Sequence, residues 1–273
     1  MPLSIRMQSL KSRAIVLWRR KRFHAVSRGS YIKCIFGPQS LKAAREHRSA
    51  THAKLHRPWS ELAISAGRPM IALPGITILT SPSLQARMIT PDEAVQFGNR
   101  ILAEAESSGE RAHWMSTLDD SFHRHVWRSL PDTVRSTLNR TMRNASLPIT
   151  GAHGDLHFSN VLRNHEGEFW LIDWETYRKH GSYVEDVSRL LGTSHRSSGL
   201  PDTADPHADI SNILASGAMN SAAGHLGMTI EMWLAMYIMS QATCELQRLR
   251  RADVRRQLCA RVEMLHSKLP LAA

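Results

Sequence analysis

The chain has 273 residues, of which 42% are hydrophobic and 22% charged, and its formal net charge is +11. This composition is typical of a globular protein with a large core, and it excludes collagen-like and disulfide-rich chains. The cysteines, Cys34, Cys244 and Cys259, lie too far apart in sequence for a zinc or redox motif, which favours a reducing cytoplasm. We expect no secretory signal, and the most apolar stretch, 230–239, is too short to span a bilayer.

Short apolar runs rich in β-branched and aromatic residues dominate the first eighty residues and predict strands. The turn at Gly37 and Pro38 is followed by a helical pattern over 40–55. Residues 1–12 show no clear period, and we expect them to be disordered. The strands are expected at 13–24 (one or two), 31–36, 70–73 and 75–80, with a hinge at 81–83.

From Thr90 onward the pattern is mainly helical. Thr90, Pro91 and Glu93 form a helix start signal, with a capping side chain, a proline in the first turn and an acid three residues after the cap. A short hairpin is expected at 160–172, with strands at 160–162 and 168–172. The expected helices cover 90–107, 115–129, 132–144, a segment from 184, 205–216, 229–250 and 253–268.

One short segment carries the chemistry. Asp155 lies in a His-Gly-Asp-Leu-His run, Asn160 follows five residues later, and Asp173 follows thirteen residues after that in Leu-Ile-Asp-Trp-Glu. Phosphoryl transfer from ATP uses such a set, because one carboxylate orients the acceptor hydroxyl while an amide and a second carboxylate hold Mg²⁺. Order and spacing match the catalytic loop and metal-binding Asp of protein kinases.

The letters around these residues resemble those of the aminoglycoside phosphotransferase and choline kinase superfamily, the small-molecule kinases with a protein-kinase-like fold. His-Gly-Asp-Leu-His stands in place of His-Arg-Asp-Leu, and Asp-Trp-Glu in place of Asp-Phe-Gly. The resemblance is sharp over 150–192 and fair over 27–57. It implies an α+β, bilobal fold with a β-rich N-lobe at 13–83, which binds the nucleotide phosphates, and a mainly helical C-lobe at 84–273.

The resemblance also assigns roles. Asp155 is the expected catalytic residue, Asn160 and Asp173 the expected Mg²⁺ ligands. Lys33 lies in an apolar strand just before a helix that contains Glu46, and this pair is expected to position the ATP phosphates. No Gly-x-Gly-x-x-Gly run precedes the lysine, so the nucleotide lid is undefined and a catalytically silent pseudokinase stays open as an alternative.

Four further residues are expected to support the site. His153 is expected to brace the loop rather than to react, and Asp186 to tie down the loop backbone, with Glu185 as the competing choice. Three roles remain for Glu175: it binds a second Mg²⁺, it binds a cationic acceptor, or it forms a salt bridge. His157 adds a His-x-Asp-x-His spacing known from metallophosphoesterases, but the further ligand blocks of such enzymes are missing from the sequence.

The basic excess is confined to the start of the chain. Residues 1–57 hold 14 Lys and Arg against one acid, Glu46, whereas the remaining 216 residues carry a net charge of −2. Such a region suits a polyanion, such as an anionic glycolipid or a membrane surface, or serves only as a solvated basic surface. Nucleic-acid binding lacks a supporting motif, and no transmembrane segment is expected.

The sequence therefore predicts an ATP- and Mg²⁺-dependent phosphotransferase acting on a small-molecule alcohol. Candidate acceptors are aminoglycosides, choline or another amino alcohol, thiamine and sugars, with a lipopolysaccharide-core sugar as the alternative. Two groups of acidic residues are candidates to line a pocket for a cationic acceptor, and they could equally belong to the loop surface. They are Asp119 with Asp120, and Asp202, Asp205 and Asp209. Several apolar residues near the C-terminus belong either to the core or to the wall of the acceptor site: Met232, Trp233, Met236, Tyr237 and Met239.

Overall fold

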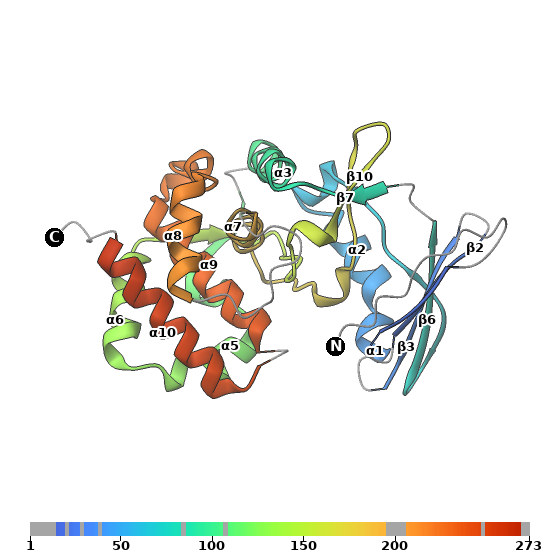
Figure 1. Ribbon diagram of the computed structural model, residues 1–273, viewed down its shortest axis with the longest axis horizontal. Helices are drawn as coiled ribbons and strands as arrows, with labels where there is room; N and C mark the ends of the chain where they lie inside the picture. The colour runs from blue at the N-terminus through green and yellow to red at the C-terminus, as the bar shows by residue number, and fades with distance from the viewer. Residues whose placement is uncertain are drawn as a thin grey trace.

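The structure, a computed structural model, describes residues 15–19, 22–27, 30–37, 40–82, 86–105, 109–194, 206–246 and 249–268. A β-sheet with two short helices forms one end of the molecule, and helices form the other (Figure 1). Residues 1–12, expected to be disordered, lie outside the described residues, as does residue 83 of the expected hinge. The other two hinge residues are part of a strand rather than of a hinge.

The N-terminal sheet has five strands in the order β1-β2-β3-β6-β5, and every neighbouring pair is antiparallel. Lys33 lies in its central strand, opposite Leu79 of the next strand. Ile35, Ala43 and Leu79 form a small buried cluster beneath the sheet. The strands are β1 (Ile15–Arg19), β2 (Arg22–Ser27), β3 (Ser30–Phe36), β5 (Arg68–Leu73) and β6 (Ile76–Pro82).

The helix expected over 40–55 is divided into α1 (Ser40–Ala43) and α2 (Glu46–Ala53). Ser40 explains part of this difference, because the strand hairpin engages it. Its hydroxyl accepts the Gly75 amide at 3.1 Å, and its carbonyl accepts the Thr77 hydroxyl at 2.7 Å. The first turn is thereby attached to the sheet, and the chain changes direction before α2.

A second sheet lies between the two regions and has the order β4-β11-β10-β7. It brings together segments from both halves of the chain, since Ala63 and Ile64 pair in parallel with Trp170 and Leu171. The sequence predicted only its hairpin. The strands are β4 (Ala63–Ile64), β7 (Ala86–Met88), β10 (Val161–Asn164) and β11 (Phe169–Leu171), and a separate two-stranded pair is formed by β8 (Arg111–His113) and β9 (Ser146–Pro148).

The helical region holds the main core. α7 lies at its centre, packed against α3 and α9, and every residue of α7 is buried (Figure 1). Thr90 caps the start of α3, as the sequence predicted, and the structure adds that it forms a capping box with Glu93. The long helices are α3 (Pro91–Glu104), α6 (Asp132–Thr141), α7 (Tyr183–Thr193), α8 (Pro206–Ser216), α9 (Ile230–Glu245) and α10 (Arg251–Lys268).

The single helix expected over 115–129 is wrong. The segment forms α4 (Trp114–Thr117), α5 (Asp120–His125) and a 3-10 turn at Trp127–Ser129. Asp119 begins a new helix there, since its carboxylate accepts the Ser121 amide at 2.7 Å. No helix among the described residues is long and apolar enough to cross a lipid bilayer.

Candidate functional site

Lys33 is the centre of a cluster of charges drawn from three separate parts of the chain. Its Nζ donates to Oδ1 of Asp173 at 2.7 Å, and it lies 3.6 Å from Oε2 of Glu46 and 3.7 Å from Oε2 of Glu175. β3 supplies the lysine, α2 supplies Glu46, and the segment after β11 supplies the other two carboxylates. The lysine side chain is only 9% exposed, so these charges interact with little screening by water.

Burial would lower the pKa of Lys33, but the carboxylates of Asp173, Glu46 and Glu175 outweigh it and raise this pKa above its ordinary value. Burial also raises the pKa of Glu46 to about 7, against the opposing attraction of Lys33. The Gly67 amide donates to Oε1 of Glu46 at 3.1 Å and fixes this carboxyl group. Among the described residues, three carboxylates therefore lie around this one ammonium.

The loop at 151–160 lies against this cluster and is fixed by its backbone. Gly154 has a φ of +80°, and a Cβ there would lie 2.5 Å from the Thr176 carbonyl oxygen, so the close approach requires glycine. The Asp186 carboxylate accepts the amides of His153 and Gly154 at 2.6 and 2.9 Å. α7 begins at Tyr183 after the capping residue Ser182, which places Asp186 in its first turn and beneath the loop.

Asp155 is held by a cation that the sequence analysis missed. NH1 of Arg189 lies 2.6 Å from Oδ1 of Asp155, and Nε2 of His157 lies 3.9 Å from its Oδ2. Burial would raise the pKa of Asp155, but Arg189 foremost, with His157, lowers it below the ordinary value. The Asp155 carboxylate is therefore ionised at neutral pH and can accept a hydrogen bond.

A signal for Arg189 was present in the sequence. It follows Asp186 by three residues on a predicted helix, and residues three apart share one helix face. Because Asp186 holds the loop, Arg189 also faces the loop and reaches Asp155. Glu185, the competing choice for the supporting carboxylate, is buried and pairs with Arg178 instead.

Asn160 and Asp173 are brought together by the hairpin. The amide of Ile172 donates to the carbonyl of Asn160 at 3.1 Å, so Asp173 follows directly beside it. Nδ2 of Asn160 donates to the Asp155 carbonyl at 2.8 Å, which leaves Oδ1 as the atom suited to a cation. Asp173 has a φ of 65°, an uncommon left-handed backbone for a residue other than glycine, and such backbones cluster at functional sites.

These residues fit Mg²⁺ bound together with a nucleotide. Among the described residues, no group of three or more His, Cys, Asp or Glu could hold a metal by itself. Mg²⁺ in phosphoryl-transfer sites takes one or two protein oxygens and completes its shell with phosphate and water. Asn160 and Asp173 supply such oxygens.

The two histidines of the loop have different surroundings. His153 is fully buried, its Nε2 lies 2.8 Å from the Ile172 carbonyl, and burial lowers its pKa, so it is a neutral donor there. His157 is partly exposed, and its Nδ1 lies 2.7 Å from the Ser159 hydroxyl. His153 thus contacts the strand that leads to Asp173, whereas His157 faces Asp155.

The expected acceptor residues are only partly placed near the loop. Asp209 is buried, accepts the Tyr237 hydroxyl at 2.7 Å and lies 3.5 Å from Nε of Arg261, so the expectation that it lines an acceptor pocket is wrong. Asp119 caps α5 and lies 3.9 Å from Nε of Arg178. Asp202 and Asp205 lie outside the described residues. Trp233, Met236, Tyr237 and Met239 are fully buried core residues, and Met232 is partly buried against them.

The chain matches no family model, and no curated protein matches it in sequence. Its structure is similar to that of the choline kinase LicA from Streptococcus pneumoniae, with a TM-score of 0.52, 13% identity and 90% of each chain covered. The same protein in complex with AMP gives a TM-score of 0.53 over 94% of each chain.

A thermostable mutant of the aminoglycoside phosphotransferase APH(4)-Ia gives a TM-score of 0.54 at 12% identity, with 95% of this chain and 96% of that chain covered. At this level of identity the likeness concerns the fold. The chain has the bilobal, kinase-like fold of the choline kinases and aminoglycoside phosphotransferases, and the resemblance found in the sequence is confirmed at that level.

Proposed function

We propose that this chain, which has the fold of the choline kinases and aminoglycoside phosphotransferases, transfers the terminal phosphoryl group of ATP to a hydroxyl group of a small molecule. The observation that carries the proposal is the convergence of Lys33, Glu46 and Asp173 beside a loop that presents Asp155 and Asn160. These groups come from positions up to 140 residues apart, and together they make up the set that phosphoryl transfer uses.

In this proposal Lys33 binds the nucleotide phosphates, and Glu46 keeps its ammonium in place. The distances of 3.6 Å to Glu46 and 2.7 Å to Asp173 show that the lysine already points into the cluster. A phosphate oxygen would replace a carboxylate as its partner, so the ammonium would stay paired. The AMP complex of LicA supports a nucleotide site in this fold.

Asn160 and Asp173 would hold the magnesium ion, which neutralises the negative charge of the phosphates when it is bound. The residues of the chain then have to position the acceptor. Asp155 would accept a hydrogen bond from the acceptor hydroxyl, because Arg189 keeps its carboxylate ionised. Such a carboxylate is a weak base, which suits a loose transition state in which positioning dominates and the proton leaves late.

The acceptor class is an alcohol. Aminoglycosides, choline and other amino alcohols, thiamine and sugars are the molecules to test, since choline kinase and aminoglycoside phosphotransferase are among the structural neighbours. An anionic glycolipid belongs in the same panel because the 14 basic residues of 1–57 would attract it.

The first test is thermal unfolding of the wild type and of Asp173→Ala, with ATP in the presence and absence of Mg²⁺. Ligand at ~100 times its Kd stabilises a fold by roughly 2.7 kcal/mol, so a clear midpoint shift is expected in the wild type. The Mg²⁺-dependent part of the shift should be lost in Asp173→Ala. No shift at millimolar ATP in the wild type would sink the nucleotide site.

The second test is ADP release with the panel of alcohols, using Asp155→Asn as the matched variant. The amide cannot accept a proton, so acceptor-dependent release should fall about a hundredfold or more while the ATP-induced midpoint shift remains. Full activity in Asp155→Asn would overturn the role of Asp155. If ATP binds but no alcohol of the panel causes ADP release, the pseudokinase alternative is favoured.

A further inference from the structure

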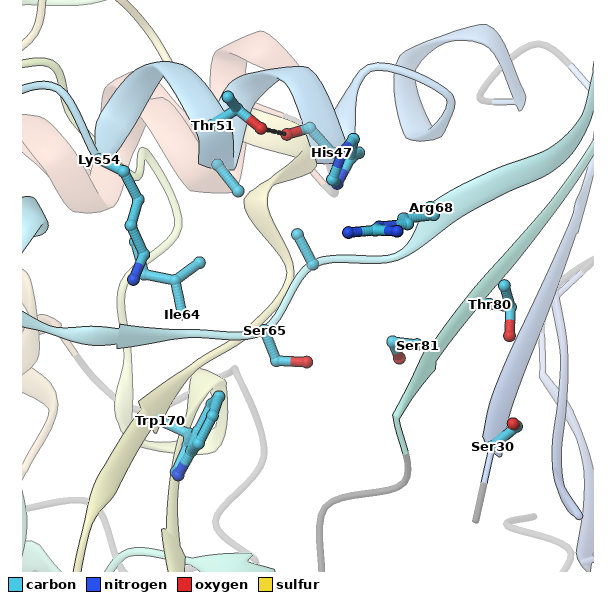
Figure 2. A pocket seen from close by; sticks show the side chains of 12 residues that line it. Ser30, His47, Thr51, Lys54, Ile64, Ser65, Arg68, Thr80, Ser81 and Trp170 are labelled. Atoms are coloured by element: carbon cyan, nitrogen blue, oxygen red, sulfur yellow. Dashed lines mark hydrogen bonds between the residues drawn. The ribbon is translucent and has the colours of Figure 1, made fainter. Parts of the chain in front are cut away.

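A cavity of about 820 Å³ lies beside α2. It is not lined by any residue of the proposed catalytic cluster, which consists of Lys33, Glu46, Asp173 and Glu175. Its walls come from α2 and its C-terminal cap, from β4 with the segment after it, from β11, and from one end of the five-stranded sheet. Figure 2 shows His47, Thr51 and Lys54 on the helix side, with Arg68 extending beneath the helix. Its size is within the range of small-molecule sites.

The corner of the sheet supplies hydroxyl groups. Ser30 begins β3, Thr80 and Ser81 lie at the end of β6, and Arg68 begins β5 opposite Thr80. Three neighbouring strands therefore deliver polar side chains at one edge of the cavity. Ser65 adds a further hydroxyl group to the lining, whereas the Thr51 hydroxyl donates to the His47 carbonyl at 2.9 Å.

The charge of the lining is of one sign. Lys54 and Arg68 line the cavity with His47, and the described lining residues include no Asp or Glu. Neither Lys54 nor Arg68 forms an ion pair with any residue that the structure describes. Two cations that pair with no described carboxylate, next to several hydroxyl groups, form a set of donors suited to an oxyanion such as phosphate.

The rest of the wall is apolar. Trp170 presents its indole ring on one side, and Ile64, Ala50 and Ala66 contribute aliphatic surface. A free inorganic ion would leave this surface without contacts. A ligand that fills the cavity therefore carries an apolar, flat body as well as an anionic group.

We propose that this cavity is a second binding site, distinct from the catalytic cluster, for a small organic phosphate with an aromatic or apolar body. Lys54 and Arg68 bind the phosphate group, and Trp170 contacts the body. The site adjoins the cluster through the chain itself, since His47 follows Glu46 and Arg68 follows Gly67, and the Gly67 amide donates to Glu46. The test therefore has to separate the two sites.

The experiment is isothermal titration of the full chain with phenyl phosphate, inorganic phosphate and phenol at millimolar concentrations. Phenyl phosphate should bind with one site per chain, about tenfold or more tightly than either inorganic phosphate or phenol. Lys54→Ala combined with Arg68→Ala should weaken this binding about tenfold. Both residues are exposed, so the double variant should keep the wild-type circular dichroism spectrum.

The matched control is Arg48→Ala combined with Arg128→Ala, which removes two exposed cations outside the cavity and should leave the affinity unchanged. Lys33→Ala should also retain binding, because Lys33 belongs to the catalytic cluster. Trp170→Leu should weaken phenyl phosphate but not inorganic phosphate.

Four outcomes would overturn the proposal. They are no binding of phenyl phosphate, equal affinity for inorganic phosphate, equal loss in the control pair, and loss of binding in Lys33→Ala. The last of these would place the phosphate in the catalytic cluster. That outcome would not contradict the proposed nucleotide site. Conversely, failure of ATP to bind would contradict the nucleotide site but not the proposed site in the cavity.

Discussion

At the scale of single residues, Arg189 determines the charge state of Asp155. Its NH1 lies 2.6 Å from Oδ1, and both side chains are largely shielded from solvent. The positive charge of Arg189 lowers the pKa of the Asp155 carboxyl group, whereas burial alone would raise this pKa. Arg189 is therefore a positioning residue for the proposed reaction rather than a group that touches the acceptor.

Arg189→Met should move the acidic limb of the kcat/KM pH profile upward, because Asp155 then loses the cation that lowers its pKa. In Arg189→Lys the acidic limb should lie closer to its wild-type position, because lysine keeps the positive charge. The profile is measured from roughly pH 5 to pH 9. Arg128→Met, at an exposed position, is the control. A uniform fall in rate with an unmoved limb would show that Arg189 acts through packing alone.

Glu46 makes stability depend on pH. Its pKa of about 7 in the folded chain lies above the ordinary 4.5, so the folded state holds this proton more tightly than the unfolded state. The stabilisation is fully present below pH 4.5 and is lost as the pH rises through 7.

Glu46→Gln should remove this contribution while keeping an acceptor for the Gly67 amide. Between pH 4.5 and pH 7 the wild type should lose roughly 1–3 kcal/mol of unfolding free energy relative to the variant. Urea unfolding at a series of pH values measures it, and Glu110→Gln, an exposed control, should follow the wild type. Parallel curves for the wild type and Glu46→Gln would contradict the raised pKa.

The proposed catalytic residues were predictable because they lie close together along the chain. Asp155 and Asn160 precede the hairpin of β10 and β11 and Asp173 follows it, so the hairpin brings the two sides together. Lys33 with Glu46 was predictable from a strand followed by a helix. The ion pair of Arg189 was not predicted. Its spacing from Asp186 places it on the loop-facing side of α7, but the packing of α7 against the loop decides that it reaches Asp155.

At the scale of the elements, strong local signals were reliable and weak ones were overridden. Thr90, for example, began α3 as expected. Two expected helices were divided: the one over 40–55, whose first residue, Ser40, is held by the strand hairpin, and the one over 115–129, in which Asp119 caps a new helix. β4 and β7 were missed because two- or three-residue strands acquire their pairing from partners distant in sequence.

Thr90→Ala tests the start of α3. The Thr90 hydroxyl accepts the Glu93 amide at 3.3 Å, and the Glu93 carboxylate accepts the Thr90 amide at 2.8 Å. Loss of the cap should cost about 1 kcal/mol, which lowers the unfolding midpoint by roughly 2–4 °C for a chain of this size. Thr133→Ala, at an exposed position of α6, is the control and should leave the midpoint within about 1 °C. An equal effect of both changes would contradict the role of the cap.

At the scale of the whole molecule, a buried charge network joins the last three helices. Arg261 of α10 donates to the Glu245 carboxylate of α9 at 2.7 and 3.0 Å and lies 3.5 Å from Asp209 of α8. The arginine side chain is 2% exposed. The network therefore fixes the relative placement of helices that the sequence predicted only one at a time.

Arg261→Met should destabilise the chain by about 3–5 kcal/mol, because it leaves two buried carboxylates without their cation. Arg256→Met is the control, since Arg256 pairs with Asp253 at the exposed surface and should change stability by less than about 0.5 kcal/mol. Urea unfolding followed by circular dichroism measures both. A loss below about 1 kcal/mol in Arg261→Met would show that the network contributes little to the fold.

The hydrogen bond between Lys33 and Asp173 joins residues 140 positions apart, and this separation affects biosynthesis. A chain grows at roughly 5–20 residues per second, so the lysine waits on the order of ten seconds for its partner to be synthesised. During that time the N-terminal sheet can form, and Glu46 is the one of the three described carboxylates around Lys33 that is already synthesised. The proposed nucleotide site is therefore complete only after both halves of the chain have folded onto each other.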